Sequence, residues 1–371
     1  MKIICSKSSL LKSVNISLKA VPSKTTMPIL ECILIDASTN QIKFTTNDME
    51  LGIETIVEGT IAEKGTVALD AKIFYEIIRR LPDNDVTIYT DDKYVATITC
   101  EKAKFTIPGK AGEDFAYLPV IEREESLTLS QFTLKEMIRQ TLFSIAVNEN
   151  NRLMTGELFE IKDNCLKIVS LDGHRISIRR MPLKREYSDK KIVVPGKTLN
   201  EISKILSGEV DAQVTIYFTK NHILFEFDQT MVVSRLIEGE YFRIDQMLSS
   251  DYDTKLSVNK KEFLDCIDRA TLLVREGDKK PIVIDIRDNK MELKINSSMG
   301  SMNEEIDIVK EGKNILIGFN PKFLIDALKV IDDENIHMYL MNPKAPCFIR
   351  DDEESYTYLI LPVNISQNQS R

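Results

Sequence analysis

One helical segment occurs three times in this chain at a constant spacing. The copies begin at Lys72, Lys197 and Lys322, which lie 125 residues apart each time (197 − 72 and 322 − 197). Each copy has cations at its first and eighth positions and an acid at its fifth, and strand-like runs precede and follow it. A fixed period along a whole chain indicates a repeat architecture, and a period this long gives each copy room for its own core. The sequence therefore predicts three similar domains.

A second amphipathic helix opens each third of the chain. In the first third its apolar residues are Leu10, Leu11, Val14 and Leu18. The spacing i, i+1, i+4 and i+8 forms one buried stripe on a helix. Alternating segments such as residues 42–46, 165–170 and 356–361 are typical of antiparallel strands. We therefore expect the α+β class, with two helices packed on an antiparallel sheet in each domain.

Polar stretches near residues 120–127 and 247–256 mark the expected domain boundaries. We expect the domains to cover residues 1–122, 123–250 and 251–371, the last with a polar C-terminal tail. Because no low-complexity linker separates these segments, we expect neighbouring domains to pack directly.

Composition narrows the class of protein. Of the 371 residues, 43% are hydrophobic and 29% are charged, which is typical of a soluble globular protein. No apolar run is long enough to cross a membrane, and six widely spaced cysteines favour reduced thiols in a cytoplasmic protein. The net charge of −8, taken alone, argues against a nucleic-acid partner. Net charge does not report how the charges are distributed, however.

The charged residues of the repeated helix share one exposed face. Residues 72, 76 and 79 fall within about 60° of one another, because successive helix residues turn by roughly 100°. One interpretation is a solvated face stabilised by Lys–Glu pairs, worth about 0.2–0.5 kcal/mol each. The other is that three such faces form a weakly positive track, which would hold a phosphate backbone without reading bases.

No motif for catalysis or metal binding stands out in the sequence. The three histidines, His174, His222 and His337, lack a second histidine or a cysteine at metal-ligand spacing. Phosphate-binding loops and nucleophile elbows are also absent from the sequence. We therefore expect no catalytic residue, no metal and no cofactor.

Two compact features are candidates for a binding site. Asp172-Gly173-His174-Arg175 is either a simple tight turn or the rim of a pocket, because strand-like residues flank it. An enzyme built on this turn is a further hypothesis, for which no nucleophile or metal partner is evident. The apolar run at residues 356–363 is either a last core strand or, at its end, one wall of a groove, since Pro362 cannot donate to a sheet.

Many separate motifs follow one another in an order known from one family. They are Thr26-Met27-Pro28-Ile29-Leu30, Phe44-Thr45-Thr46-Asn47-Asp48-Met49-Glu50, Arg80-Leu81-Pro82, Pro108-Gly109, Glu113-Asp114-Phe115, Leu118-Pro119, Asp172-Gly173-His174-Arg175, Val194-Pro195 and the strand from Tyr358 to Pro362. Together with the threefold period, residues 1 to about 364 resemble the bacterial sliding clamp, the beta subunit of DNA polymerase III.

The resemblance implies a fold and a function. Three clamp domains per chain would join a second copy head to tail in a homodimeric ring that encircles double-stranded DNA independently of its sequence. Such a ring is a processivity factor without catalytic activity of its own. The implied partners are the replicative DNA polymerase subunit, the clamp loader, and repair and translesion polymerases, with no membrane. The alternative from the residues alone is a three-domain scaffold that binds peptides without encircling DNA.

The resemblance also assigns residues to sites. The expected partner-peptide pocket consists of Met154, Leu171, Gly173, His174, Arg175, Ile176, Phe242, Gln246, Met247, Leu359, Leu361, Pro362 and Val363. The expected DNA-facing residues are Lys24, Arg79, Arg80, Asn148, Arg152 and Lys197. The expected dimer interface consists of Phe105 and Ile107 of one chain and Leu272, Leu273, Glu304 and Glu305 of the next.

The chain departs from the family pattern in two places. Tyr241-Phe242-Arg243-Ile244 stands where the family commonly has Phe-Pro-Asp-Tyr, so Phe242 replaces the usual proline, and Gln246 replaces an expected basic residue nearby. We therefore expect a bulkier, less cationic pocket wall with an altered peptide preference. The chain also continues past Val363 through the polar residues 366–371, which we expect to be mobile.

Overall fold

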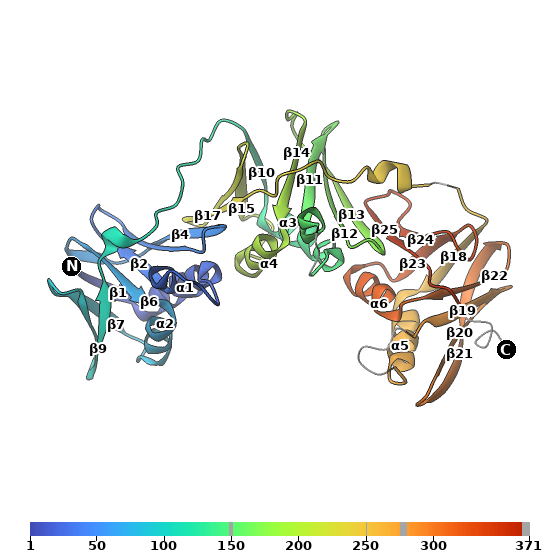
Figure 1. The fold of residues 1–371 in the computed structure, drawn as a ribbon, viewed down its shortest axis with the longest axis horizontal. Coiled ribbons are helices and arrows are strands. Elements are labelled where there is room, and N and C mark those ends of the chain that lie inside the picture. Colours follow the sequence, from blue (N-terminus) through green and yellow to red (C-terminus); the bar gives the residue numbers. More distant parts are fainter. Residues whose placement is uncertain (148–150, 250, 275–279, 366–371) are drawn as a thin grey trace. The chain divides into compact units, whose positions relative to one another are not determined.

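The computed structural model describes residues 1–147, 151–249, 251–274 and 280–365 (Figure 1). Within these residues the α-helices are α1 (Lys7–Ser17), α2 (Ala71–Arg80), α3 (Gln131–Arg139), α4 (Gly196–Ile205), α5 (Lys260–Thr271) and α6 (Pro321–Val330). Helices α2, α4 and α6 contain the three copies of the repeated segment, and α1, α3 and α5 are the helices that open each third. Both helix predictions are therefore confirmed. The tail expected to be mobile lies outside the described residues.

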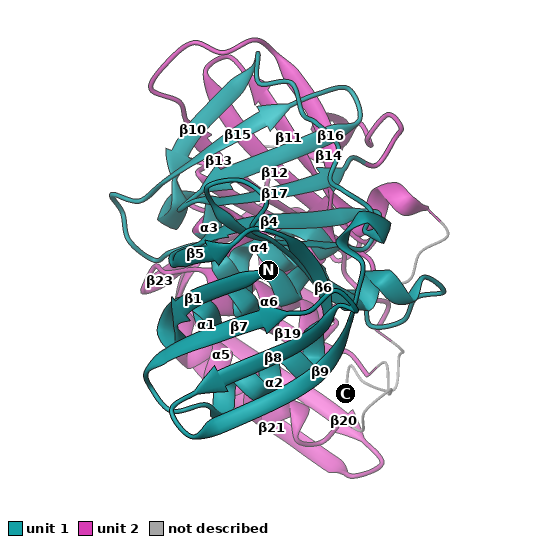
Figure 2. Cartoon of the chain, turned by 90° about the vertical axis from the view of Figure 1, so that its left-hand side faces the viewer, with its two compact units in different colours: residues 1–135, 197–236 teal, residues 136–196, 237–371 magenta. Residues whose placement is uncertain are grey.

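The chain separates into two compact units, which Figure 2 shows in different colours. The first unit contains residues 1–135 and 197–236, and the second contains residues 136–196 and 237–371. The division passes through α3 and α4, so the central third contributes to both units. The two units do not test the three expected domain ranges, which therefore stay a prediction.

The described part of the first unit contains one antiparallel sheet of thirteen strands, in the order β10-β15-β16-β17-β4-β3-β2-β6-β9-β8-β7-β1-β5. These strands are β1 (Lys2–Ser6), β2 (Cys32–Asp36), β3 (Ile42–Asn47), β4 (Leu51–Val57), β5 (Thr60–Glu63), β6 (Thr66–Asp70), β7 (Asp85–Thr90), β8 (Val95–Cys100), β9 (Ala103–Lys110), β10 (Ser126–Ser130), β15 (Gln213–Phe218), β16 (His222–Phe227) and β17 (Thr230–Arg235). Strand β17 pairs with β4, with Val232 opposite Ile53, so the sheet continues from the first third into the central third.

The described part of the second unit contains one antiparallel sheet of twelve strands, in the order β14-β11-β12-β13-β25-β24-β23-β18-β21-β20-β19-β22. These strands are β11 (Gly156–Lys162), β12 (Cys165–Leu171), β13 (Arg175–Pro182), β14 (Lys190–Pro195), β18 (Thr254–Asn259), β19 (Ile282–Arg287), β20 (Lys290–Ser297), β21 (Gly300–Gly312), β22 (Ile315–Phe319), β23 (Asn335–Leu340), β24 (Cys347–Arg350) and β25 (Tyr356–Ile360). Pairing of β13 with β25, with Ile176 opposite Leu359, joins the central third to the last third.

The helices bury apolar stripes against these sheets. In the first unit α1 packs beside α2, and Leu10, Val14, Phe74 and Ile78 are fully buried in the core between helices and strands. In the second unit α5 packs beside α6 in the same way. Asp70 caps α2 by accepting a hydrogen bond from the Ile73 amide at 2.8 Å, which satisfies one of the free N–H groups of the first turn. The expected α+β class is therefore confirmed.

The second unit buries one carboxyl group with no ionic partner. Glu157 on β11 is fully buried, and neither carboxylate oxygen has a hydrogen-bond partner. Burial raises the pKa of Glu157 to about 8, because desolvation disfavours the carboxylate. The nearby hydroxyl of Thr141 acts in the opposite direction, but it donates to the Met137 carbonyl and offsets little of this rise. Glu160, two residues along the same strand, is neutralised by Lys167 and Lys191. Although burial opposes ionisation, these lysines hold the pKa of Glu160 below its ordinary value.

All six cysteines are unpaired, and five of them are buried. The fold therefore places no two cysteines in a disulfide, and the sequence had favoured free thiols. None of the described helices has the length and apolar character needed to cross a membrane.

Candidate functional site

The cluster at residues 172–175 forms the tight turn between β12 and β13. Asp172 Oδ1 accepts hydrogen bonds from the backbone N–H of His174 at 3.0 Å and of Arg175 at 3.2 Å. Gly173 has φ +82°, a left-handed conformation that favours glycine, and a Cβ there would meet nothing within 4 Å. The His174 side chain is exposed and stacks on Phe323 of α6 at 6.0 Å between ring centroids. The turn therefore displays an imidazole and holds it against a helix.

The Arg175 side chain is buried beneath this turn, with an exposed fraction of only 8%. Its Nε donates to Asp172 Oδ2 at 3.0 Å, and its Nη1 donates to Asp326 Oδ2 at 2.7 Å. Its Nη2 donates to the Phe143 carbonyl at 2.7 Å. The guanidinium also lies 4.6 Å from the Phe323 ring centroid, a cation–π distance. Arg175 therefore connects the turn to α6 and offers little of its charge to solvent.

The C-terminal segment leaves the sheet immediately after β25 and is anchored at two points. The backbone N–H of Leu361 donates to the His174 carbonyl at 2.9 Å, and that of Val363 donates to the Gly318 carbonyl at 2.9 Å. A Cβ on Gly318 would lie 2.9 Å from Cγ1 of Ile365, so glycine permits this close approach. The side chains of Leu361 and Val363 are each 36% exposed. These residues therefore form an apolar ledge beside the turn.

One hydrophobic cluster lies under the turn and beside this ledge. It consists of Leu158, Val169, Leu171, Ile176, Ile178, Val193, Ile237, Tyr241, Ile244, Tyr339, Phe348 and Leu359, with Leu153, Met154, Phe242 and Leu248 packed against it. Five residues expected in the pocket thus meet in this cluster: Met154, Leu171, Ile176, Phe242 and Leu359. Gln246 and Met247 are exposed at the 3-10 turn Ile244–Met247, and Phe242 packs edge-on against Tyr241 at 5.5 Å.

The acids of the first two repeated helices pair with cations of their own helix. Glu76 Oε2 on α2 lies 2.8 Å from Arg79 Nη2 and 3.0 Å from Arg80 Nη2. Glu201 on α4 lies 2.7 Å from Lys204 Nζ. These faces are solvated, and pairing between residues three and four apart accounts for much of their charge.

The third repeated helix differs from the other two. Asp326 on α6 pairs with Arg175 of the turn instead of a cation on its own helix. The ion pairs among the described residues include neither Lys322 nor Lys329, and both lysines are exposed. Helix α6 therefore presents two cations that no acid of that helix neutralises.

The residues expected to face DNA are exposed wherever they are described. Lys24, Arg79, Arg80 and Lys197 are exposed on the first unit, and Arg152 is exposed on the second. Lys197 forms an ion pair with Asp48, whose side chain is only 5% exposed. Asn148 lies outside the described residues.

Helix α2 and strand β9 border an open hollow of about 310 Å³. It is lined by Lys72, Ile73, Glu76, Ile77, Arg80 and Phe105. Phe105 is 40% exposed and Ile73 is 51% exposed, whereas Ile107 is packed in the core of the unit at 9%. Ile73 was not among the residues predicted for a site, because an isoleucine four residues before the buried Ile77 is expected on the buried face of the helix.

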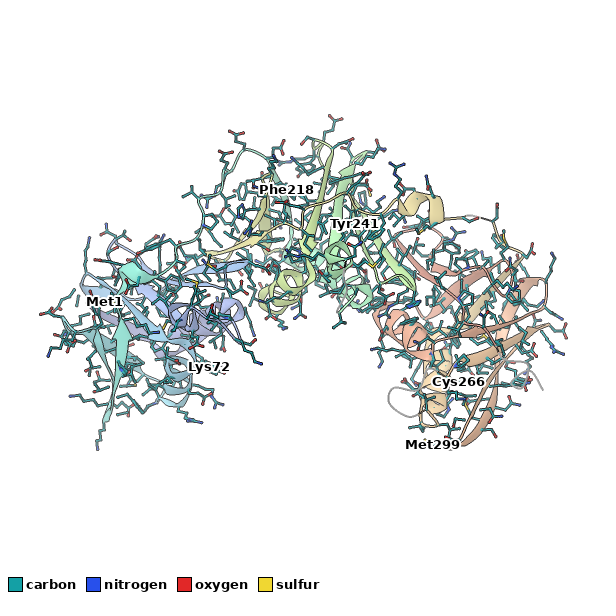
Figure 3. The ribbon with its side chains drawn as sticks, viewed as in Figure 1. Met1, Lys72, Phe218, Tyr241, Cys266 and Met299 are labelled. Carbon is teal, nitrogen blue, oxygen red and sulfur yellow. The ribbon has the colours of Figure 1, made fainter. Side chains whose placement is uncertain are left out.

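The second unit displays an apolar residue directly after α5. Leu272 is 75% exposed, whereas the neighbouring Leu273 packs against the core of the unit. Met299, at the tip of the hairpin between β20 and β21, is also exposed (Figure 3). Leu272 is therefore the residue of this pair that is free to enter a partner.

The two expected interface acids have partners on their own unit. Arg269 Nε donates to Glu304 Oε2 at 2.9 Å, and Lys290 Nζ lies 3.0 Å from Glu305 Oε1. Lys290 also lies 2.7 Å from Asp307 Oδ1, so on that face of β21 two acids, Glu305 and Asp307, share one lysine.

Family models match nearly the whole chain. The N-terminal, central and C-terminal domains of the DNA polymerase III beta subunit match residues 1–119, 128–242 and 245–364, respectively. The chain belongs to the DNA polymerase III beta subunit family. A beta sliding clamp of Staphylococcus epidermidis is 35% identical over 364 residues, which cover 95% of this chain and 96% of the relative. Members of this family are accessory subunits of DNA polymerase, and the chain is a sliding clamp that acts as a processivity factor.

Solved structures of the family share the fold. A crystal structure of an assigned DNA polymerase III beta subunit from Eubacterium rectale is 69% identical, with a TM-score of 0.96 and coverage of 98% of this chain and 100% of that one. The DNA polymerase sliding clamp of Bacillus subtilis is 34% identical, with a TM-score of 0.95 and coverage of 99% and 100%. The resemblance inferred from the sequence motifs is confirmed, and the clamp is supported over the non-encircling scaffold.

Proposed function

We propose that two copies of this chain close head to tail around duplex DNA and that partner proteins dock by a short peptide at the turn of residues 172–175. The observation that carries the proposal is a matched pair of apolar features. Phe105 lines a hollow on one unit, and Leu272 protrudes from the other with 75% exposure. A contact between two different surfaces of one chain generates a closed ring when the rotation closes.

Charge supports the same pairing. Lys72 and Arg80 flank the hollow of Phe105, and only Glu76 opposes them there. On the other unit, Glu304 lies near Leu272, because it pairs with Arg269, three residues before Leu272, and Glu305 follows it on strand β21. Opposite charges at the two surfaces would steer them together and set their register, whereas self-contact of either surface would bring like charges together. Arg80, expected to face DNA, is thus proposed to lie at the edge of the subunit interface.

The proposed DNA contacts are to phosphate only. Lys24, Lys197, Lys322 and Lys329 are exposed, and Arg152 adds a further cation. Lysines on helix faces bind phosphates as point charges without reading bases, which allows the ring to slide. Acidic residues elsewhere account for the net charge of −8.

The proposed peptide pocket has an apolar floor and a narrow polar guide. Leu171, Ile176 and Leu359 belong to the floor, Leu361 and Val363 form the ledge, and the exposed ring of His174 is the polar guide. A groove of this kind suits a short, partly apolar segment. We propose the replicative polymerase subunit, the clamp loader, and repair and translesion polymerases as partners in the cytoplasm. The chain itself is proposed to have no catalytic activity.

The test compares circular and linear DNA of the same sequence. The protein is placed on nicked circular DNA with the clamp loader of the same cell, and retention is measured by gel filtration at about 0.05 M and 0.5 M salt, a range that strips electrostatic binders. A topologically linked ring stays on the circle at high salt and leaves when a restriction enzyme cuts it. Equal loss from both templates at every salt concentration would overturn encirclement.

A further inference from the structure

The acid at the fifth position of the repeated helix has a different partner in its third copy. Glu76 and Glu201 pair with arginine or lysine on their own helices at 2.7–3.0 Å. Asp326 instead accepts a 2.7 Å hydrogen bond from Arg175, a residue 151 positions away in the sequence. A solvated helix face explains Glu76 and Glu201, but it does not explain Asp326.

We propose that Asp326 is a positioning residue of the peptide pocket. Through Arg175 it holds the turn at residues 172–175, and through the His174 carbonyl it holds the ledge at Leu361. This inference rests on the proposed peptide site and adds a residue of α6 to it.

The first link is the buried guanidinium. Arg175 is 8% exposed and directs Nε, Nη1 and Nη2 to Asp172, Asp326 and the Phe143 carbonyl. Removing the Asp326 charge would leave Nη1 without its anionic acceptor in a desolvated place, and a buried donor without a partner is costly. The guanidinium would then relax, and Asp172, which also closes the turn through Oδ1, would relax with it.

The second link is the face of α6 that meets the turn. Phe323 lies three residues before Asp326 and therefore shares its helix face. Its ring stacks on His174 at 6.0 Å and lies 4.6 Å from the Arg175 guanidinium. One helix face thus holds both the imidazole and the guanidinium of the turn.

The third link runs from the turn to the ledge. The His174 carbonyl accepts the Leu361 N–H, whereas Val363 is anchored separately on the Gly318 carbonyl. A shift of the turn therefore loosens Leu361 and leaves Val363 in place. A ledge that is already ordered binds a peptide more tightly, because less conformational entropy is lost on binding.

The test measures peptide binding to full-length protein. Overlapping 12-residue fluorescent peptides that cover the replicative polymerase subunit are screened against the wild-type chain by anisotropy, and the tightest one becomes the probe. We expect Asp326→Asn to bind it about tenfold more weakly, the effect of one lost charge-assisted hydrogen bond, and Asp326→Glu to recover most of the affinity. The matched control Glu201→Gln changes the same repeat position on α4 and should bind the probe like wild type.

Amide hydrogen exchange supplies a readout that general loss of stability would not reproduce. In Asp326→Asn the Leu361 amide should exchange about tenfold faster, since its acceptor loosens, while the Val363 amide should keep its wild-type rate. If Asp326→Asn fails to fold, Arg175→Lys replaces it, because lysine keeps the charge but cannot bridge both carboxylates. The same selective loosening at Leu361 is expected there.

Two results would overturn the role of Asp326. One is wild-type affinity in Asp326→Asn. The other is equal acceleration at Leu361 and Val363 with a lowered melting temperature, which indicates a purely structural contact. A wild-type chain that binds none of the peptides overturns the proposed pocket itself, and the role of Asp326 falls with it.

Discussion

Phe105 and Arg80 line the same hollow, on a strand and a helix of one unit. The family resemblance had assigned Phe105 to the subunit interface and Arg80 to the DNA. Their shared hollow joins an apolar side chain that is 40% exposed to a guanidinium that is 71% exposed. Association of two chains at this place would bury the apolar ring and keep the cation at the rim, where it still attracts an acidic surface.

Phe105→Ala is expected to weaken the dimer. Burying one such side chain contributes about 1.5–3 kcal/mol, and a head-to-tail ring contains two such contacts, so the dissociation constant should rise roughly 10²- to 10⁴-fold. Sedimentation equilibrium measures this change. Tyr89→Ala is the control, because Tyr89 is similarly exposed, at 42%. Ile88 lies opposite Ile98, which lies opposite Phe105, so these three side chains share one face of the sheet. Tyr89 follows Ile88 and therefore points to the other face. Equal weakening by both variants would contradict the assigned interface.

Leu272→Asp and Leu273→Asp should have different consequences, although the residues are neighbours. Leu272 is 75% exposed, so a charge there should give monomers whose folded core is undisturbed. Leu273 packs against the core, so a charge there should lower the melting temperature by several degrees. Differential scanning calorimetry and sedimentation velocity separate the two effects. A stable dimer of Leu272→Asp would count against ring closure at this residue.

The lysines of α6 should contribute to the salt dependence of DNA binding. The double variant Lys322→Gln with Lys329→Gln removes four lysines from the dimeric ring, so it should reduce the slope of log affinity against log salt by up to about 3.6, since each phosphate contact contributes about 0.9. Anisotropy with a short labelled duplex measures the slope. The double control Lys43→Gln with Lys313→Gln removes lysines that are 2.8 Å from Glu54 and 2.9 Å from Asp253, and its slope should match wild type. An unchanged slope in the α6 variant would remove this helix from the track.

Glu157 should make the clamp less stable as the pH rises from about 4.5 to about 8. The folded state holds its proton up to a pKa of about 8, whereas the unfolded chain releases it near the ordinary value of 4.5. The unfolded state binds fewer protons in this window, so the free energy of unfolding falls by up to about 1.4 kcal/mol per pH unit and levels off above the folded pKa. Glu157→Met should flatten this dependence, as urea unfolding at several pH values would show.

The matched control for this pH effect is Glu160→Gln. The pKa of Glu160 is lowered in the fold despite its burial, because Lys167 and Lys191 favour the carboxylate. The contribution of Glu160 to the free energy of unfolding is therefore present above the ordinary pKa of a glutamate and is lost in acid. Its pH dependence has the opposite sign to that of Glu157. Glu160→Gln should lower stability near pH 7 by a few kcal/mol, since it leaves Lys167, at 16% exposure, without its buried partner. If Glu157→Met had the pH profile of the wild type, the Glu157 carboxyl would be shown to ionise freely.

Removing residues 361–371 should abolish stimulation of the polymerase and leave the dimer intact. Strand β25 ends at Ile360, so the truncated chain keeps every paired strand described for the second unit and loses the ledge together with the residues that follow it. Removing residues 366–371 alone keeps Leu361, Val363 and Ile365 and should preserve stimulation. Primer extension measures stimulation, and sedimentation velocity checks assembly. Monomers after the longer deletion would contradict the separation of pocket and interface.

Much of the architecture could be predicted because it depends on local periodicity. The apolar stripes of α1 and α2, the turn at Gly173 and the end of β25 before Pro362 all follow from side-chain spacing or backbone preference. The family assignment came from motifs such as Asp172-Gly173-His174-Arg175, which keep their order along the chain. Each of these patterns involves residues that are close together in the sequence, and it specifies the local structure of those same residues.

The sequence by itself determined the threefold repeat, the helix and strand types and the family, since each is encoded in short-range pattern. Only the tertiary structure decided that Arg175 is buried against Asp326, that Phe105 is open while Ile107 is packed, and that the strands of the central third divide between two sheets. The physical reason is that ion pairing and burial depend on distances between residues far apart in the chain. Asp326 has the same local setting as Glu201, yet packing brings a guanidinium within 2.7 Å of Asp326 alone of the two.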